Sequence, residues 1–415
     1  MYVPTASIAV VVKSFPRLSN TFITQELRAL ERSGLRLRLY ALGGTGHAKP
    51  SAAEREIRAP VTVLSRLIAT SPATLLAPVT APAVARRALF ADLRRNPSPR
   101  RLAYFTLARA LAVALPDDAA RLYAHFLDGA GSVARYAALM TGRPWCAFAH
   151  ADIWAMPVWE VREKLADADW IATCTKAGHD RLSGLGGDPE KVFLSYHGIA
   201  LGVIPDPLPA RPPRNGGDKD NPVHLLSVGR AVEKKGYDVL LEALARLPGN
   251  LSWRFEHIGG GPRLSALKAK TNALDLGGRV SWLGPKSHDK VLEHCRRADV
   301  FVLASHIAAK GRRDGLPNVL VEAQSQGLAC VATNISAIPE LIRDGETGLL
   351  VAPESPDTLA DALVWMMRNP AARLRMGANG AERVRRHFDM DVGIRRLLAR
   401  LAAPAADARR AAGRR

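Results

Sequence analysis

Short apolar runs alternate with segments of helical periodicity along most of this chain. In the first half, five apolar runs have the length and content of buried strands: 7–12, 35–42, 121–124, 145–149 and 170–174. Helical patterns lie between them, for example through residues 25–31 and 158–166. Because strands that alternate with helices form parallel sheets, this half of the chain predicts an α/β domain.

The composition changes near residue 205, where prolines and glycines follow one another closely. Prolines remove backbone donors and glycines resist ordering, so residues 206–220 are predicted to form a linker. Beyond the linker the alternation starts again, and strands are predicted at 223–228, 253–258, 280–283, 300–303 and 328–332. Helices are predicted between these strands at 237–246, 289–297 and 317–326.

The whole pattern predicts two Rossmann-like, doubly wound α/β domains that face a central cleft. The first would comprise residues 1–205 and the second residues 221–388, followed by a C-terminal helix and basic tail at 389–415. Ligands of such sheets bind at the carboxyl ends of the strands. Polar residues that directly follow a predicted strand are therefore the candidates for chemistry.

The composition is that of a soluble globular protein, but the charge is unusual. Among 415 residues, 47% are hydrophobic and 23% charged, and 58 lysines and arginines face 39 acidic residues, a net charge of +19. A solvated basic surface explains the excess; attraction to an anionic membrane or a lipid-linked diphosphate is the functional alternative. The arginine-rich helical region 86–109 is the candidate membrane surface, although two amphipathic helices packed on a core explain it equally well.

Three other features exclude or disfavour whole classes of protein. The basic residues are spread over both halves and aromatic residues are only 6%, so nucleic acid is not a predicted partner. No segment has the order of a signal peptide, and prolines interrupt the longest uncharged stretch, 67–85. The cysteines are widely spaced within apolar runs, which predicts reduced core residues rather than disulfides or a zinc site: Cys146, Cys174, Cys295 and Cys330.

The most informative segment is Asp314–Glu322. Pro317 favours a helix start at that residue, so the amides from Leu316 to Val319 would form an anion site at the helix N-terminus. Asp314 precedes this site and Glu322 lies inside the helix. Two carboxylates around an amide-lined phosphate site suit a nucleotide sugar, which carries hydroxyl groups on both sides of a diphosphate. The alternative is that Asp314 caps the helix and Glu322 forms a surface pair.

A second group of residues follows the first strand of the second domain. Gly229 and Arg230 end this strand, and Lys235 follows five residues later. Two cations at a strand end would neutralise a diphosphate and stabilise it as a leaving group. Gly259 and Gly260 follow the next strand, where a base could approach the backbone closely; a tight turn explains them equally well.

The first domain offers a histidine in the corresponding place. His150 follows the predicted strand 145–149, and Asp152 is close behind it. A structural histidine is the alternative. The connection between the first strand and the first helix contains Ser19, Asn20 and Thr21. If the ligand is a nucleotide sugar, these three residues are the candidates for binding the acceptor that receives the sugar. Ser19 or Asn20 could instead cap the helix.

Together these motifs resemble glycosyltransferase family 4, whose members have the GT-B fold, and in particular its exopolysaccharide and colanic-acid-type members. The resemblance runs from Phe15-Pro16, with Ser19, Thr21, Phe22, Ile23 and Glu26, to Arg383 and Phe388-Asp389. Its strongest parts are Gly229-Arg230 with Lys235-Gly236, the segment 314–323, and Ser336 with Ile338-Pro339-Glu340.

The resemblance implies a retaining glycosyltransferase that needs no metal ion or other cofactor. Its partners would be a nucleotide-diphosphate sugar as donor and a saccharide or polyprenol-diphosphate-linked acceptor. Arg230 and Lys235 would bind the diphosphate, Glu322 the ribose hydroxyls, and His150 would face the transferred sugar. Asp314 would act on the donor sugar and is counted with His150, Arg230 and Lys235 as catalytic. The implied donor-binding set is Gly229, Arg230, Lys235, Gly259, Gly260, Asp314, Gly315, Leu316, Pro317, Asn318, Val319 and Glu322.

Two positions depart from the family pattern. The family usually has glutamate where this chain has Asp314, one methylene shorter. Many relatives also carry one more residue between the histidine at position 150 and the Asp-Ile-aromatic run that follows it. The first departure bears on the identity of the sugar and the second on the register of His150.

Other functions are possible on the same fold. A phosphorylase or a sucrose-synthase-like enzyme is the enzymatic alternative, and a basic nucleic-acid-binding protein is the non-enzymatic one. A Rossmann dehydrogenase is disfavoured because the chain has no GxGxxG motif. We expect a cytoplasmic protein, with the inner face of the membrane as a further location.

Overall fold

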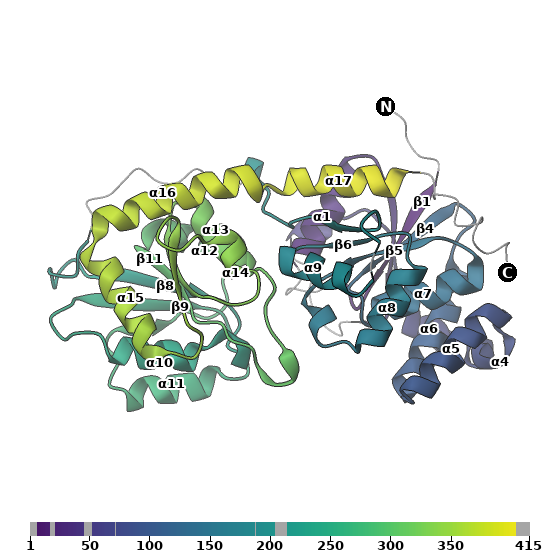
Figure 1. The fold of residues 1–415 in the computed structure, drawn as a ribbon, viewed down its shortest axis with the longest axis horizontal. Coiled ribbons are helices and arrows are strands. Elements are labelled where there is room, and N and C mark those ends of the chain that lie inside the picture. Colours follow the sequence, from purple (N-terminus) through teal and green to yellow (C-terminus); the bar gives the residue numbers. More distant parts are fainter. Residues whose placement is uncertain are drawn as a thin grey trace. The chain divides into compact units, whose positions relative to one another are not determined.

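The computed structural model describes residues 6–16, 21–44, 52–70, 72–186, 188–203 and 214–403. Their contacts divide the chain into two compact units (Figure 1). The N-terminal domain comprises Met1–His197 together with Asp391–Arg415, and the C-terminal domain comprises Gly198–Met390. Of the predicted linker, residues 206–213 lie outside the described residues, and 214–220 belong to the C-terminal domain.

The N-terminal domain is built on a seven-stranded parallel sheet with the order β3-β2-β1-β4-β5-β6-β7. Its strands are β1 (Ser7–Val12), β2 (Arg36–Ala41), β3 (Val61–Val63), β4 (Ala119–His125), β5 (Trp145–Ala149), β6 (Ile171–Thr173) and β7 (Val192–Leu194). Every residue of β1 is buried, as expected of a central strand covered on both faces. The strand order reverses between β1 and β4, and such a switch point is where ligands enter doubly wound sheets.

Helices cover both faces of this sheet. They are α1 (Thr21–Arg32), α2 (Ala52–Arg55), α3 (Leu64–Thr70), η1 (Pro72–Leu76), α4 (Ala77–Thr80), α5 (Ala83–Arg95), α6 (Pro99–Ala114), α7 (Ala130–Thr141), η2 (Ala151–Trp154), α8 (Val158–Asp167) and α9 (Lys176–Gly184). Helices α4, α5 and α6 gather at one end of the domain (Figure 1). Phe105 of α6 packs against Tyr136 of α7, with ring centroids 5.1 Å apart, and both are buried in the domain core.

The last helix, α17 (Met390–Ala402), returns to the N-terminal domain. A Cβ at Gly393 would lie 2.7 Å from the carbonyl oxygen of Tyr196, so only glycine permits this approach. Arg396 and Arg400 donate hydrogen bonds to the carbonyl oxygens of Leu194 (3.0 Å) and Glu190 (2.9 Å). Residues 404–415 of the predicted basic tail lie outside the described residues.

The C-terminal domain repeats the architecture with a six-stranded parallel sheet, order β10-β9-β8-β11-β12-β13. Its strands are β8 (Val223–Val228), β9 (Trp253–Ile258), β10 (Val280–Trp282), β11 (Val300–Leu303), β12 (Ala329–Thr333) and β13 (Gly348–Val351). Its helices are η3 (Leu201–Val203), η4 (Glu233–Lys235), α10 (Tyr237–Ala245), α11 (Leu264–Ala273), α12 (His288–Arg297), η5 (Ala309–Gly311), α13 (Asn318–Ser325), α14 (Ile338–Leu341), α15 (Pro356–Arg368) and α16 (Pro370–His387). Phe255, Val302 and Met366 lie in its core.

Two further findings concern helix length and the cysteines. Within the described residues, no helix combines the length and apolarity needed to cross a bilayer. All four cysteines are free thiols, as predicted, and three of them are buried.

Candidate functional site

Two lysines and one carboxylate form a cluster at the carboxyl edge of the C-terminal sheet. Lys234 and Lys235 end η4, which follows β8, and Asp314 lies on the loop after β11. The two lysine Nζ atoms each lie 2.6 Å from a different carboxylate oxygen of Asp314. Burial raises the pKa of Asp314, but the two ammonium groups outweigh it and bring that pKa down to about 2. Asp314 is therefore ionised at neutral pH, and the cluster keeps a net positive charge.

Gly236 explains how the chain places this cluster. Its φ is +61°, and an added Cβ would lie 1.9 Å from the carbonyl oxygen of Ala304, so no other residue fits. The turn after η4 therefore lies against the end of β11. The backbone N–H of His306 completes the contact by donating to the carbonyl oxygen of Lys234 at 3.0 Å. This packing brings the lysines to the loop that carries Asp314.

Helix α13 begins four residues after Asp314. Its first residue is Asn318, one later than predicted, and Pro317 is the N-cap residue, with no side-chain cap. The alternative reading of Asp314 as a helix cap is therefore wrong. The first N–H groups of the helix lack intrahelical partners, and Gly315, Leu316 and Asn318 are only partly buried. These donors are available to an anion.

Glu322 lies one turn inside α13 and is mostly buried. Its carboxylate is 3.5 Å from Nε2 of His288 on α12. The hydrogen bond to Glu322 raises the pKa of His288, against the opposing effect of burial. Glu322 thus has an ion-pair partner whose side chain is 42% exposed, which agrees with the surface pair considered from the sequence.

The glycines after β8 and β9 have a packing role. Gly229 and Gly259 have φ angles of +159° and +148°, and a Cβ on Gly259 would lie 2.0 Å from the carbonyl oxygen of Gly229. The backbone N–H of Ala231 donates to the carbonyl oxygen of Gly260 at 2.9 Å. The two loops therefore pack tightly together, which is the turn role considered for these glycines; contact with a base stays a prediction. The side chain of Arg230 is exposed beside them.

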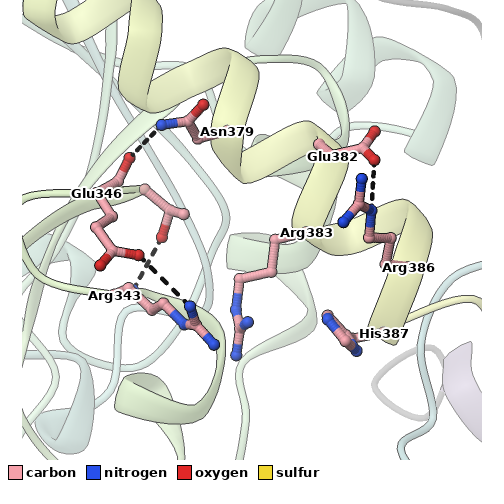
Figure 2. A pocket seen from close by; sticks show the side chains of 8 residues that line it. Arg343, Glu346, Asn379, Glu382, Arg383, Arg386 and His387 are labelled. Atoms are coloured by element: carbon pink, nitrogen blue, oxygen red, sulfur yellow. Dashed lines mark hydrogen bonds and ion pairs between the residues drawn. The ribbon is translucent and has the colours of Figure 1, made fainter.

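A separate cavity of about 490 Å³ lies at the opposite edge of the same sheet (Figure 2). The loop before β13 and the end of α16 line it with Arg343, Glu346, Thr347, Asn379, Glu382, Arg383, Arg386 and His387. Arg343 pairs with Glu346, and Arg386 pairs with Glu382. Arg383 donates to the carbonyl oxygens of Leu341 and Glu340. These charges serve one another and the backbone, and none of the predicted site residues lies here.

In the N-terminal domain, His150 lies at the carboxyl edge of the sheet, directly after β5. It is only 8% exposed, and its Nδ1 atom lies 3.2 Å from Nε2 of His197. Burial lowers the pKa of both imidazoles, assisted by neighbouring histidines, and that of His197 falls to about 4. Cys174 is close, and one donor atom from each of these three residues lies within 4.8 Å of the others. The sequence showed no Cys/His cluster, because the three residues are far apart along the chain.

Asp152 has a different place from His150. Its carboxylate accepts the backbone N–H groups of Asp128 (2.8 Å) and His150 (3.0 Å), which ties the loops after β4 and β5 together. On the other side, the Nζ atom of Lys164 donates to the carbonyl oxygen of Leu127 at 2.7 Å and bonds Glu160 at 2.8 Å. Two buried polar side chains from different helices thus fix the loop after β4.

That loop borders a cavity of about 730 Å³ at the switch point of the N-terminal sheet. Phe126 forms part of its wall with a φ of +74°, an unusual conformation for an aromatic residue. Strained backbone of this kind gathers at functional sites. The cavity is lined by residues that follow β1, β2, β4 and β5 and by α6: Lys13, Ser14, Leu42, Gly43, Gly44, Arg100, Tyr104, Leu107, Phe126, Asp128, Gly129 and Asp152.

The structure adds residues that the sequence analysis did not single out for a site. Lys234 shares Asp314 with Lys235, and His288 pairs with Glu322. His197, Glu26 and His125 surround His150 in the N-terminal domain. Of the predicted acceptor-binding residues, Ser19 and Asn20 lie outside the described residues, and Thr21 is the first residue of α1.

Residues 212–383 match the family model for glycosyl transferases group 1. The matched region carries the Lys234–Asp314–Lys235 cluster and α13. This match lies within the C-terminal domain and covers less than half of the chain.

Several curated relatives of the chain have names from polysaccharide synthesis. A putative colanic acid biosynthesis glycosyltransferase of Escherichia coli is 31% identical over 223 residues, 53% of each chain. An amylovoran biosynthesis glycosyltransferase of Erwinia amylovora is 28% identical over 62% of this chain and 63% of the relative. A lipopolysaccharide core biosynthesis glycosyltransferase of Rhizobium meliloti is 31% identical over 52% of this chain and 59% of the relative. The chain thus spans only 53–63% of the length of these relatives.

Solved structures show the fold of the whole chain. Anabaena HepE, in complex with UDP and glucose, has a TM-score of 0.68 at 16% identity and covers 96% of this chain and 99% of its own. Sucrose-phosphate synthase of Thermosynechococcus elongatus has a TM-score of 0.69 at 19% identity and covers 95% and 98%. The predicted GT-B architecture of two Rossmann-like domains is confirmed.

Proposed function

We propose that this protein is a retaining glycosyltransferase that moves a sugar from a nucleotide-diphosphate donor to a saccharide or lipid-linked acceptor. The observation that carries this proposal is the Lys234–Asp314–Lys235 cluster beside the first turn of α13, inside the matched family region. The relatives' names favour exopolysaccharide or other cell-surface glycan synthesis.

The donor diphosphate would bind at this cluster. Lys234 and Lys235 supply positive charge held in place by Asp314, and the free N–H groups of α13 supply hydrogen bonds. Arg230, exposed at the end of β8, would bind the same anion. Positive groups fixed in advance where charge develops stabilise a departing diphosphate strongly. Glu322 would then hold the ribose hydroxyls.

The acceptor would bind in the cavity of the N-terminal domain. Phe126, Leu42 and Leu107 give this cavity apolar walls, while Asp128 and Arg100 pair with each other at 3.1 Å. Apolar surface suits the faces of a sugar ring, and paired charged groups suit the hydroxyls at its edge. His150 would face the transferred sugar.

The proposed step exchanges one bond for another at the anomeric carbon. The bond from this carbon to the diphosphate oxygen breaks, and the acceptor oxygen bonds to the same face of the carbon. Because the new bond forms on the face from which the diphosphate leaves, the configuration is retained. The acceptor's proton passes to the departing diphosphate oxygen. Because lysines and amides supply the positive charge that a divalent cation would otherwise supply, we propose that no metal ion or other cofactor is needed.

A nucleotide screen tests the proposal. Thermal shift against UDP, GDP, ADP and their sugars should identify one nucleotide class, since a ligand at about 100 times its dissociation constant adds roughly 2.7 kcal/mol of stability. Transfer with the matching sugar should survive EDTA. If no nucleotide stabilises the protein, the proposed donor site is wrong. If transfer strictly needs an added divalent ion, the proposed metal-independent mechanism is wrong.

We also propose that the N-terminal domain binds anionic membrane surfaces peripherally. Helices α5 and α6 pack on the core through Leu89 and Phe105, but their outer residues Phe90 and Val113 are 56% and 62% exposed, among several exposed arginines. Such attraction is screened beyond about 8 Å at physiological salt. The protein should bind anionic vesicles and be released by high salt; binding that resists salt, or none at all, would contradict this proposal.

A further inference from the structure

A buried carboxylate lies behind His150 in the N-terminal domain. Glu26 of α1 is 3% exposed and accepts a hydrogen bond from the hydroxyl of Tyr123 at 2.6 Å. The same oxygen of Glu26 lies 3.3 Å from Nε2 of His125. Its other oxygen lies 4.0 Å from Nδ1 of His197, whose Nε2 atom in turn lies 3.2 Å from Nδ1 of His150. A row of polar groups thus leads from Glu26 through His197 to His150.

Aromatic rings hold the two imidazoles of this row in place. The ring of Phe22 lies 5.0 Å from that of His150 and 4.7 Å from that of His197, between centroids. Phe148 lies 5.1 Å and 4.4 Å from the same two rings, and the two imidazoles are within 12° of parallel. The rings therefore cannot turn freely, and their nitrogen atoms keep their partners.

The charges in this region favour one distribution of protons. Burial raises the pKa of Glu26, but His125 and His197 outweigh it, so the net shift is downward and the carboxylate is ionised. Burial lowers the pKa of both His150 and His197, which are neutral at pH 7. A neutral imidazole has one nitrogen that donates and one that accepts, so its orientation in such a row decides which nitrogen faces a ligand.

We propose that Glu26 and His197 are positioning residues that fix the tautomer of His150. The negative charge of Glu26, 4.0 Å away, favours the proton of His197 on Nδ1, so Nε2 of His197 accepts a hydrogen bond from the Nδ1–H of His150. The Nε2 atom of His150 is then left as an acceptor for a sugar hydroxyl. The identity of that hydroxyl group rests on the proposed function; the tautomer does not.

The surroundings of His150 Nε2 provide the second observation. This nitrogen is buried and has no hydrogen-bond partner among the described residues. A buried polar atom without a partner costs free energy, which a ligand that donates a hydrogen bond would recover. Nε2 of His150, which the proposed tautomer makes an acceptor, is therefore also the atom that lacks a hydrogen-bond donor.

Nuclear magnetic resonance of protein with ¹⁵N-labelled histidine tests the tautomer without any substrate. Long-range ¹H–¹⁵N correlations distinguish a ring protonated on Nδ1 from one protonated on Nε2, and loss of signals in His150→Gln and His197→Gln assigns the two rings. We expect Nδ1–H at His150 in the wild type and a mixture of tautomers in Glu26→Gln. His150 protonated on Nε2, or a spectrum unchanged by Glu26→Gln, would overturn the proposal.

A series of variants links the tautomer to turnover. His197→Gln retains a carbonyl that can accept from His150, whereas His197→Phe retains only the aromatic stacking. With the nucleotide sugar that the wild type turns over fastest, kcat should fall about 10- to 100-fold in Glu26→Gln and His197→Phe and less in His197→Gln. Affinity for the free nucleotide diphosphate should not change, because it would bind in the other domain. His179→Gln, on α9, is the matched control and should leave kcat unchanged.

These outcomes separate the inference from the proposed function. If no nucleotide sugar is turned over, the proposed function fails, but the tautomer is still tested by the spectra. If transfer occurs and Glu26→Gln leaves kcat unchanged in a protein of normal thermal stability, the positioning role fails. A metal ion held by His150, His197 and Cys174 would also overturn it: EDTA would then change the histidine spectrum, and Cys174→Ser would change it in the same way.

Discussion

The two sheets of this protein present different chemistry at the same structural position. At the carboxyl edge of the C-terminal sheet, Lys234, Lys235 and Asp314 are charged and partly exposed. At the carboxyl edge of the N-terminal sheet, His150 and His197 are neutral, mostly buried and enclosed by aromatic rings. The first arrangement suits an anion that arrives from water. The second suits the orientation of hydroxyl groups in a site that excludes water.

Under the proposed function, this difference would divide a transfer reaction between the two sheets. Partly exposed charges retain their ionisation and can neutralise a diphosphate as it leaves. Buried neutral groups interact weakly with ions but have well-defined hydrogen-bond directions, which is what selection of one hydroxyl among several needs. Changes to the first site should therefore alter binding and departure of the phosphate, and changes to the second should alter the geometry of transfer.

The largest effect should come from the lysine cluster. We expect Lys235→Ala and Arg230→Ala each to weaken nucleotide-diphosphate binding and to cost about 2–4 kcal/mol in the transition state, roughly 30- to 1000-fold in kcat/KM. Steady-state kinetics and calorimetry with the free nucleotide diphosphate measure the two parts. Lys290→Ala, an exposed lysine on α12 in the same domain, is the matched control. Near-normal kinetics in both site variants would remove the diphosphate from this edge.

Acid should act next on the N-terminal site. Folding lowers the pKa of His197 from 6.5 to about 4, so between these values the unfolded chain binds more protons than the folded one. Stability therefore falls as the pH drops, and this residue alone should cost the N-terminal domain about 2 kcal/mol between pH 7 and pH 5. Glu26, His125 and His150 are the titratable groups that share this environment.

Hydrogen exchange of the amides in β4 and β5 measures this effect domain by domain. The wild type should lose more protection between pH 7 and pH 5 than His197→Gln, which carries no titratable group at position 197. Equal losses in the two proteins would mean that His197 is not buried and neutral. Asp314 supplies the contrast, since its pKa of about 2 keeps the lysine cluster intact down to about pH 4.

The central strands could be predicted from the sequence because their apolar runs are long. The bounds of β1, β5, β8, β9 and β11 agree with the predicted ranges. The strands that were missed, β3, β7 and β13, have three or four residues and lie at sheet edges. An edge strand needs less apolar sequence because one side meets solvent or a loop, so its pattern is weak.

The two sites also differ in how far they can be predicted from the sequence. Arg230, Lys235 and the segment 314–322 are read from short contiguous motifs, although the contact between Lys235 and Asp314 joins distant parts of the chain. Glu26, His125 and His197 reach His150 from α1, β4 and the segment after β7. No local spacing joins these positions. Only the strand order, which places β4 and β5 side by side, brings them together.

A smaller effect should separate Glu322 from the lysines. Glu322→Gln should raise the donor Michaelis constant about fivefold with any sugar, because an amide accepts fewer hydrogen bonds than a carboxylate and the loss is about 1 kcal/mol. Initial rates over a range of donor concentrations measure it. His288→Gln removes the partner of Glu322 and leaves its carboxylate. If His288→Gln raises the constant as much as Glu322→Gln does, the pair is structural and Glu322 does not hold the ribose.

The smallest change in nucleotide affinity should accompany the largest change in sugar preference. Asp314→Glu introduces the residue that is usual in the family that the chain resembles, and it moves the carboxylate by one methylene group. Its two lysine partners are flexible enough to follow it, so the positive cluster should persist and free nucleotide diphosphate should bind almost as before. The carboxylate would nevertheless extend further beyond Gly315, toward the region where a sugar on the second phosphate must lie. Competition between several donor sugars and the free nucleotide diphosphate, in wild type and variant, measures both quantities. If Asp314→Glu weakens nucleotide binding and leaves the ranking of sugars unchanged, Asp314 serves the diphosphate and the sugar is chosen elsewhere.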